Sequence, residues 1–273
     1  MMAVASLLVE LHTEELPPKA LKSLSEAFAA GIEKGLRARH FLAADSAVTA
    51  FGAPRRLAVH IGAVAGRSPD QPFRQKLVPV SVGLDARGNA TPALLKKLAA
   101  LGANVDHRGL RRENDGKQDV LVYEGTRPGA DLADGLQAAL DEAIARLPIP
   151  KVMSYQLADG ATTVQFVRPA HRLVALHGAQ VVPVAALGLQ AGRETFGHRF
   201  HTSAPLSIDD ADGYARQLED DGRVIASFGR RRDRIESLVE AQAARLGATA
   251  VMPAELLDEV TALVEWPAVY ASE

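Results

Sequence analysis

The chain has 273 residues, a formal net charge of −2 at pH 7, 47% apolar residues and no cysteine. This length and apolar content can build one large or two ordinary domains, and the lack of cysteine excludes disulfides, thiolate zinc sites and cysteine nucleophiles. Because the net charge is small, any affinity for nucleic acid must come from local patches of positive charge.

The sequence also bears on the compartment. No stretch approaches the roughly 20 continuous apolar residues of a membrane span. The short apolar run at residues 3–9 lacks the length and the basic flank of a signal peptide. A chain without cysteine fits a reducing compartment. We therefore expect a cytoplasmic protein.

The first 150 residues are predicted to mix strands and helices. Leu21, Leu24, Phe28, Ile32 and Leu36 recur at spacings of three and four, which gives one helix an apolar face. The elements expected in this part are a buried strand at 6–11, a helix from Pro18 to about residue 40, a strand pair at 47–66 interrupted at Gly52–Pro54, a strand at 73–82 weakened by Pro79, a helix from Pro92 capped by Thr91 and ended by Gly102, a hairpin at 108–124 turning at Asn114–Gly116, and a helix at 132–147.

A central stretch at residues 160–201 gathers arginines and histidines on short apolar segments. Arg168, Arg172, Arg193 and Arg199 stand there against a single acid, Glu194. We expect a strand at 161–167, a short helix at 169–176 that begins with Pro169, and a strand at 181–187. Frequent glycines then place Arg193, His198, Arg199 and His201 on turns or a short strand. Such loops often carry recognition side chains.

Beyond this stretch the sequence becomes more helical. We expect helices at 209–219, at 229–246 with Ser227 as its cap, and at 255–264. The fold class predicted from these patterns is α+β, with mixed or antiparallel sheets and packed helices in the first part and more helix toward the carboxyl end. Pro148–Ile149–Pro150 is the expected joint between domains at 1–150 and 151–273.

Four motifs in order connect the chain with a known family. They are LLVELHTEELPPKAL at 7–21, APRRLAV at 53–59, FVRPAHRLVALHG at 166–178 with AGRETFGHRFH at 191–201, and LLDEVTALVEWP at 256–267. Together they resemble the β subunit of the bacterial-type heterotetrameric glycyl-tRNA synthetase across nearly the whole chain. Two departures are that Leu11–His12 stands where an apolar residue and a glycine are more usual, and that Met153–Tyr155 lacks the common Arg-Trp pattern.

The resemblance implies a role within a larger enzyme. The expected reaction is the ATP-dependent joining of glycine to its tRNA by two α and two β subunits, with ATP and Mg bound at the α subunit. Because the family's β subunit is much longer, we expect this chain to be an amino-terminal fragment that ends just after Trp266–Pro267 and is inactive alone. Its expected partners are the α subunit and tRNA(Gly).

The residues themselves offer little catalytic chemistry. The sequence has no GxxxxGK[ST] nucleotide cradle, no GxGxxG between a strand and a helix, and no GxSxG elbow. Glu14–Glu15 is interpreted as a structural pair before a helix, because adjacent side chains on extended backbone point to opposite faces. A metal site at His171, His177, His198 and His201 is disfavoured, since Arg199 would stand beside the ion. We therefore name no catalytic, cofactor-binding or metal-binding residue.

The arginines are the remaining candidates, with alternatives left open. Arg55–Arg56 can be interpreted equally as a phosphate-binding pair or as a solvated pair. For the four central arginines, contact with RNA and hydrogen bonding to backbone carbonyls are the two open interpretations. A binding role is favoured for the arginines at the start of the helix after Ser227, where the dipole opposes their charge. Aromatic residues make up only 5% of the chain, which favours contact with the shape and phosphates of folded RNA over base stacking. The RNA- or partner-binding candidates are Arg55, Arg56, Arg168, Arg172, Arg193, His198, Arg199, His201, Arg230, Arg231 and Arg232.

Two functional hypotheses follow. In the first, this part of the subunit recognises tRNA and assembles with the α subunit. In the second, it is an assembly scaffold whose basic loops meet protein, with no direct RNA contact.

Overall fold

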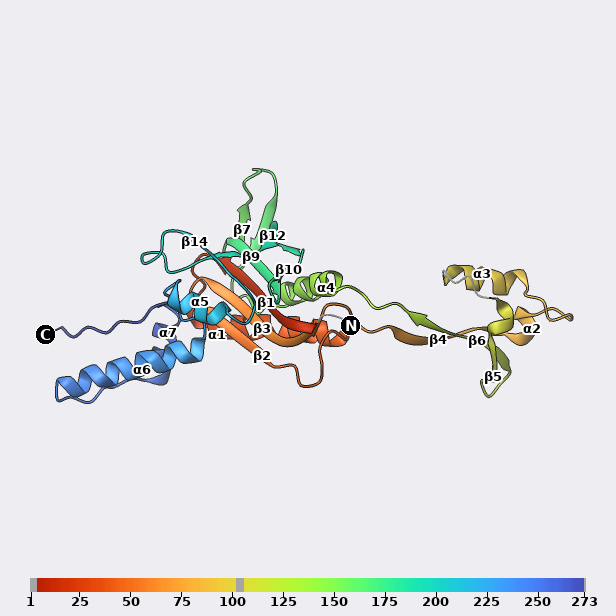
Figure 1. Ribbon diagram of the computed structural model, residues 1–273, viewed down its shortest axis with the longest axis horizontal. Helices are drawn as coiled ribbons and strands as arrows, with labels where there is room; N and C mark the ends of the chain where they lie inside the picture. Colours follow the sequence, from red (N-terminus) through yellow and green to blue (C-terminus); the bar gives the residue numbers. More distant parts are fainter. Residues whose placement is uncertain (1–3, 102–105, 273) are drawn as a thin grey trace. The chain divides into compact units, whose positions relative to one another are not determined.

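A computed structural model of the chain describes residues 4–101 and 106–272 (Figure 1). It contains helices together with mixed and antiparallel sheets, which confirms the predicted α+β class. The chain forms two compact units, a larger one of Met1–Ser68 with Ala130–Glu273 and a smaller one of Pro69–Gly129. The joint expected at Pro148–Pro150 lies inside the larger unit, because strands from both sides of it share one sheet.

The larger unit is built on a seven-stranded sheet with β1 at its centre. Strand β1 (Val4–Thr13) pairs antiparallel with β3 (Arg56–Ala65) on one side and with β9 (Ala170–His177) on the other. The strand order is β11-β12-β9-β1-β3-β2, and β10 also pairs with β9. The outer strands are β2 (Val48–Ala53), β10 (Gln180–Val181), β11 (Ala185–Ala186) and β12 (Leu189–Gly192), the last of which runs parallel to β9.

Two helices cover one face of this sheet. The apolar stripe of α1 (Pro18–Ala38) is buried as its spacing predicted, and α1 packs against α4 (Leu132–Ala145). A Cβ atom added at Gly35 would lie 2.6 Å from the Cβ of Ala139, so the two helices touch where only small residues fit. Leu7, Val9 and Leu11 of β1 belong to the same apolar core.

A second apolar cluster covers the opposite face of the sheet. It joins Leu8, Val174 and Leu176 of the sheet to Tyr214 and Leu218 of a short helix. That helix is α5 (Tyr214–Asp220), which starts later than the helix expected at 209–219 because Asp210 accepts a hydrogen bond from Gly213 in the preceding turn. The neighbouring hairpin consists of β13 (Glu194–Phe196) and β14 (Pro205–Ser207).

The prediction of a helix at 169–176 is wrong, because this segment is β9. Its four consecutive apolar residues, Leu173–Leu176, are all buried, which a helix with one apolar stripe would not allow. Pro169 precedes the strand, where its missing N–H leaves the ladder intact. The strand expected at 181–187 is split into β10 and β11 on either side of Pro183, while the strand at 161–167 is found as β8 (Thr163–Phe166), paired with β7 (Met153–Gln156).

The carboxyl-terminal part carries the two helices predicted there. Helix α6 (Phe228–Arg245) begins after Ser227, whose hydroxyl accepts a hydrogen bond from the Arg230 N–H. Helix α7 (Ala254–Thr261) packs against it. No helix in the described ranges combines the length and apolarity needed to cross a membrane.

The smaller unit is a three-stranded antiparallel sheet with short helices. The predicted hairpin is confirmed, and Leu94, Leu98 and Leu121 form the core. Thr91 caps its helix as expected, whereas the expected end at Gly102 lies outside the described residues. The first strand ends at Pro79, and residues expected to extend it form a helical turn instead. The elements are β4 (Gln71–Pro79), α2 (Val80–Gly83), α3 (Pro92–Ala100), η1 (His107–Gly109), β5 (Arg111–Asn114) and β6 (Asp119–Arg127).

Candidate functional site

Charged and polar side chains gather on the sheet face opposite α1 and α4. Side chains alternate along a strand, so Leu11 of β1 faces the helices while Glu10 and His12 face the other way. His12 stands directly opposite Arg56 of β3 and Arg172 of β9. Residues opposite each other in an antiparallel pair share a face, so two arginines flank one histidine.

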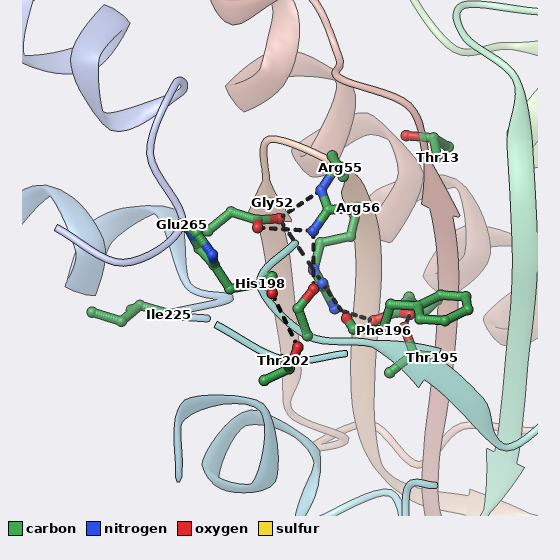
Figure 2. Close-up of polar contacts among 12 residues, drawn as sticks. Thr13, Gly52, Arg55, Arg56, Thr195, Phe196, His198, Thr202, Ile225 and Glu265 are labelled. Carbon is green, nitrogen blue, oxygen red and sulfur yellow. Dashed lines mark hydrogen bonds and ion pairs between the residues drawn. The ribbon is translucent and has the colours of Figure 1, made fainter. Parts of the chain in front are cut away.

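An ion pair inside the protein anchors this face. The Arg56 Nη1 atom lies 3.1 Å from Glu10 Oε2, and both side chains have an exposed fraction of 0%. The hydroxyls of Thr195 and Tyr214 also donate to the Glu10 carboxylate. Arg56 Nη2 donates to the Phe196 carbonyl at 2.7 Å (Figure 2). Glu10 therefore has a partner from each of three separate elements.

The pKa values of this cluster follow from its burial. Burial and the Glu10 carboxylate both raise the pKa of Tyr214 well above its usual value, so its phenol stays protonated and can donate. Burial acts to lower the pKa of Arg56, but its interactions with Glu10, Tyr214 and Glu265 together outweigh burial, and the pKa lies above its usual value. Arg56 is therefore a permanent cation neutralised inside the fold.

A second buried pair lies beside the first. Arg55, at the tip of the β2–β3 hairpin, donates to Glu265 Oε2 at 3.0 Å (Figure 2). It also donates to the Gly197 carbonyl at 2.9 Å. The side chains of Arg55 and Glu265 are 8% and 7% exposed. This pair connects the hairpin tip, the loop after β13 and the segment after α7.

Arg231 on α6 is also buried and fully engaged. Its guanidinium donates to the carbonyls of Ile225, Gly52 and Thr261 at 2.6, 2.8 and 2.9 Å. Burial lowers its pKa to about 10, so it remains charged at neutral pH. The structure thus places three of the predicted RNA- or partner-binding candidates, Arg55, Arg56 and Arg231, inside the fold, where their side chains bond other groups of the chain.

The other central arginines divide into three kinds. Arg168 donates to the Glu15 carbonyl and Arg193 donates to the Ala179 carbonyl. These two arginines therefore bond backbone carbonyls, one of the two alternatives left open for them. The guanidinium of Arg172 lies 5.3 Å from the centre of the Phe196 ring and has no acidic partner among the residues described. Arg199 pairs with Glu14 and Glu15 at 3.0 and 3.2 Å, so these two acids are its ion-pair partners.

The remaining candidates lie at or near the surface. Arg230 pairs with Glu219 at 2.9 Å, and Arg232 pairs with Asp258 at 2.8 Å, so acids of the chain itself meet these charges. The rings of His198 and His201 lie 4.4 Å apart. Within residues 4–101 and 106–272, no group of three or more His, Cys, Asp or Glu side chains is arranged to hold a metal ion.

An open pocket of about 300 Å³ lies next to the buried network. Its lining includes His12, Glu14, His171, Phe196 and Arg199. At the pocket His171 Nε2 and Glu14 Oε1 lie 3.0 Å apart. Burial acts to raise the pKa of Glu14, but the hydrogen bonds from His171 and Arg199 outweigh it and lower that pKa. Glu14 therefore holds two basic side chains at the pocket.

His12 is the unusual member of the pocket. It is only 4% exposed, and neither ring nitrogen has a hydrogen-bond partner in the described parts of the chain. Burial first, and then the nearby charges of Arg56, Arg55, His171 and Arg199, lower its pKa to about 2. His12 is therefore a neutral imidazole at physiological pH.

Sequence reasoning missed Glu10, His12, Tyr214 and Glu265. A charged residue inside the apolar run of 6–11 was the available signal for Glu10, and the departure at Leu11–His12 was the signal for His12. Tyr214 and Glu265 carried no such signal, because their partners lie far away in the sequence.

The buried neutral His12 leads to a pH prediction. The folded-state pKa is depressed, so below pH 6.5 the unfolded chain binds a proton that the folded chain does not, and stability falls as the pH falls. From pH 6.5 to 5 this residue is expected to remove about 1.5 kcal/mol from the free energy of unfolding. Urea titrations across that range measure the decrease, which the His12→Phe variant should largely lack. Equal pH slopes in the two proteins would contradict the prediction.

Comparison with known proteins gives this site its context. The family model described as "Glycyl-tRNA synthetase beta subunit" matches residues 7–273. The chain is 56% identical to the glycine–tRNA ligase beta subunit of Dechloromonas aromatica, over 97% of the chain and 39% of that protein. It is 58% identical to the beta subunit of Thiobacillus denitrificans, over 97% of the chain and 38% of that protein. The chain spans less than half of the length of these relatives, and it belongs to the glycyl-tRNA synthetase beta subunit family.

Proposed function

We propose that this chain is part of a glycyl-tRNA synthetase, in which it contributes tRNA recognition and assembly with an α subunit. The relatives are named glycine–tRNA ligase beta subunit, and that name supports both the reaction and an α-subunit partner. In this proposal the enzyme joins glycine to tRNA(Gly) in the cytoplasm as a heterotetramer of two α and two β subunits. ATP and Mg are bound by the α subunit, where the chemistry takes place.

The charge of the smaller unit is the observation that carries the RNA part of the proposal. Residues 69–129 contain ten Lys and Arg against seven Asp and Glu, although the whole chain is net negative. Three of these cations, Arg74, Lys76 and Arg111, pair with acids of the same unit. The others are exposed and have no acidic partner in the described part of the chain: Arg87, Lys96, Lys97, Arg108, Arg112, Lys117 and Arg127.

Unpaired exposed cations are what phosphate contact requires. An RNA phosphate that meets such a side chain releases a counterion and displaces no internal ion pair. By contrast, Arg199, Arg230 and Arg232 of the larger unit already face acids. We therefore place the RNA phosphate contacts on the smaller unit in preference to the loops of the larger one.

Salt titration with tRNA tests this placement. Replacing Lys96 and Lys97 of α3 with alanine removes two unpaired charges and keeps good helix formers. We expect the plot of log affinity against log salt for a labelled tRNA(Gly) transcript to become shallower by about one for each phosphate that the variant no longer binds. The binding can be measured by fluorescence anisotropy at several salt concentrations.

A matched control lies in the same unit. Arg111→Ala removes one cation that is already paired with Glu124, and it is expected to change the salt slope far less. If the Lys96/Lys97 variant kept the slope of the unchanged chain, these two residues would not contact phosphate. If Arg111→Ala reduced the salt slope as much as the Lys96/Lys97 variant does, the effect would come from the net charge of the unit. Specific phosphate contacts of Lys96 and Lys97 would then be contradicted.

A second candidate function is that of an assembly scaffold without RNA contact. The feature that favours it is the apolar surface of the carboxyl-terminal helical region, where large apolar side chains are more than half exposed. Apolar surface of this kind is typical of protein interfaces. The residues are Leu246, Val251, Leu256, Leu263 and Tyr270. If the same titration shows no tRNA binding even at low salt, this alternative is favoured.

A further inference from the structure

The pocket beside His12 has the features of a small polar ligand site. Its volume of about 300 Å³ lies at the lower end of the range for small-molecule sites in proteins, roughly 300–1,000 Å³. It is lined by hydroxyl, imidazole and guanidinium groups and the Glu14 carboxylate, together with one aromatic ring, that of Phe196. The loop after β13 and the end of β1 supply most of the lining. The central sheet and the β13–β14 hairpin therefore position the pocket.

His12 gives this pocket unused hydrogen-bonding capacity. Nearly all buried polar groups in folded proteins have a partner, and each exception calls for an explanation. Here both imidazole nitrogens lack one among the residues described, in a side chain that is 96% buried and lines the pocket. A neutral imidazole presents one N–H donor and one lone pair. It therefore suits a ligand whose edge carries both acceptors and donors.

The charges around the pocket argue against an anion as that ligand. Arg55 and Arg56 are matched by Glu265 and Glu10 at 3.0 and 3.1 Å, and Arg199 is matched by Glu14 and Glu15. The imidazole of His12 adds no charge. A phosphate would have to displace one of these internal pairs, whereas a neutral polar ring would not.

The aromatic neighbours favour a flat ring. The ring centres of His12 and Phe196 lie 5.6 Å apart with their planes tilted by 51°, and the Arg172 guanidinium lies over the Phe196 ring, 5.3 Å from its centre. Aromatic rings and guanidinium planes are the surfaces on which proteins stack unpaired nucleobases, while polar side chains bond the edge of the base. A single pocket of this kind needs few aromatic residues, in keeping with the sparse aromatic content of the chain.

We propose that the pocket formed by His12, Phe196 and the Glu14–His171–Arg199 cluster binds one unpaired nucleobase of RNA, with His12 as the side chain that bonds the edge of the base. The proposal rests on the proposed function, since it takes tRNA as the source of the base. The cluster of Glu14, His171 and Arg199 borders the place where the attached ribose would lie. Both nitrogens of His12 are covered in this structure, so binding requires the imidazole to turn and present one of them to the pocket.

Nucleosides test the pocket without the rest of the RNA. The 273-residue chain would be titrated with adenosine, guanosine, cytidine and uridine at millimolar concentrations, with the imidazole nitrogens of His12 observed by NMR and binding measured by calorimetry. We expect at least one nucleoside to bind and to shift the His12 signals, while inorganic phosphate neither binds at the same concentrations nor displaces it. Phosphate that displaced the nucleoside, or no nucleoside binding at all, would overturn the proposal.

Variants separate a ligand-binding His12 from a structural one. His12→Phe keeps a ring of similar shape but removes both nitrogens, so nucleoside binding is expected to fall at least tenfold while the melting temperature stays the same or rises. Phe196→Leu keeps apolar cover without the aromatic face and is expected to weaken binding severalfold, which gives an independent readout if His12→Phe folds poorly. His107→Phe, in the smaller unit, is the control and should bind as the unchanged chain does. Unchanged nucleoside affinity in His12→Phe would also overturn the proposal.

The experiment distinguishes this inference from the proposed function. If tRNA binds with a steep salt dependence but no nucleoside binds, the pocket proposal fails and tRNA recognition stands. If a nucleoside binds at His12 and tRNA does not bind at any salt concentration, the pocket stands as a base site and the assignment of tRNA as the partner fails.

Discussion

Replacing Glu10 with alanine is expected to lower the free energy of unfolding of the larger unit by about 3–5 kcal/mol. The change leaves the Arg56 guanidinium, at 0% exposure, with only the more distant carboxylate of Glu265, 4.0 Å away, as an acidic partner. It also removes the acceptor that Thr195 and Tyr214 share. An isolated buried cation is far less favourable than a paired one, because the interior cannot replace the water that solvated the charge. Urea unfolding followed by the emission of Trp266, the one tryptophan in the sequence, measures the effect.

The double variant Glu10→Leu/Arg56→Met is the control for this prediction. Removing both charges together leaves no unpaired ion, and replacement of a buried pair by apolar residues of similar size is often neutral. We expect the double variant to recover most of the stability that Glu10→Ala removes. A double variant as unstable as the single one would mean that the hydroxyls of Thr195 and Tyr214, and not the ion pair, account for the destabilisation.

Local signals predicted the parts of the fold that depend on neighbouring residues. The apolar spacing of α1, the caps at Thr91 and Ser227, and the hairpin turn at Asn114–Gly116 are all confirmed. Each of these features is decided within a few residues of chain, by side-chain periodicity or by a hydroxyl that meets a nearby N–H.

The sequence did not predict the features that depend on contacts between distant parts of the chain. The apolar run at Leu173–Leu176 fits a buried strand as well as a helix, and only its pairing with β1 and β12 makes it β9. In the same way, Arg56 resembles a surface cation until its partner Glu10, 46 residues away, is known, and Arg55 meets Glu265 across 210 residues. A sequence shows a charge but not the acid that folding brings to it.

The three arginines that open α6 show how much this distinction matters for experiments. Arg230 has a side chain that is 62% exposed, Arg232 is 29% exposed, and Arg231 between them is fully buried. Residues one apart on a helix point in different directions. Arg230 and Arg232 therefore form ion pairs at or near the surface, while Arg231 bonds carbonyls inside the fold. Replacing all three with alanine would therefore mix the removal of surface charge with damage to the fold.

Single replacements resolve that mixture. Arg231→Ala leaves the carbonyls of Gly52, Ile225 and Thr261 buried without their donor, and it is expected to lower the free energy of unfolding by about 3–5 kcal/mol. Arg230→Ala removes only an exposed pair with Glu219 and is expected to change stability by less than about 1 kcal/mol. Urea unfolding of both variants, beside tRNA binding measured well below their melting temperatures, gives the comparison.

The outcome decides what Arg231 does. If Arg231→Ala is much less stable but binds tRNA as Arg230→Ala does while still folded, Arg231 only joins α6 to the β2–β3 hairpin and to the end of α7. If its stability is unchanged and tRNA binding disappears, the guanidinium must leave its three carbonyls to reach RNA, and a buried structural role for Arg231 is wrong. The three internal hydrogen bonds of 2.6–2.9 Å make the first result the expected one, because no phosphate contact at a surface would replace them without exposing three carbonyls in the interior.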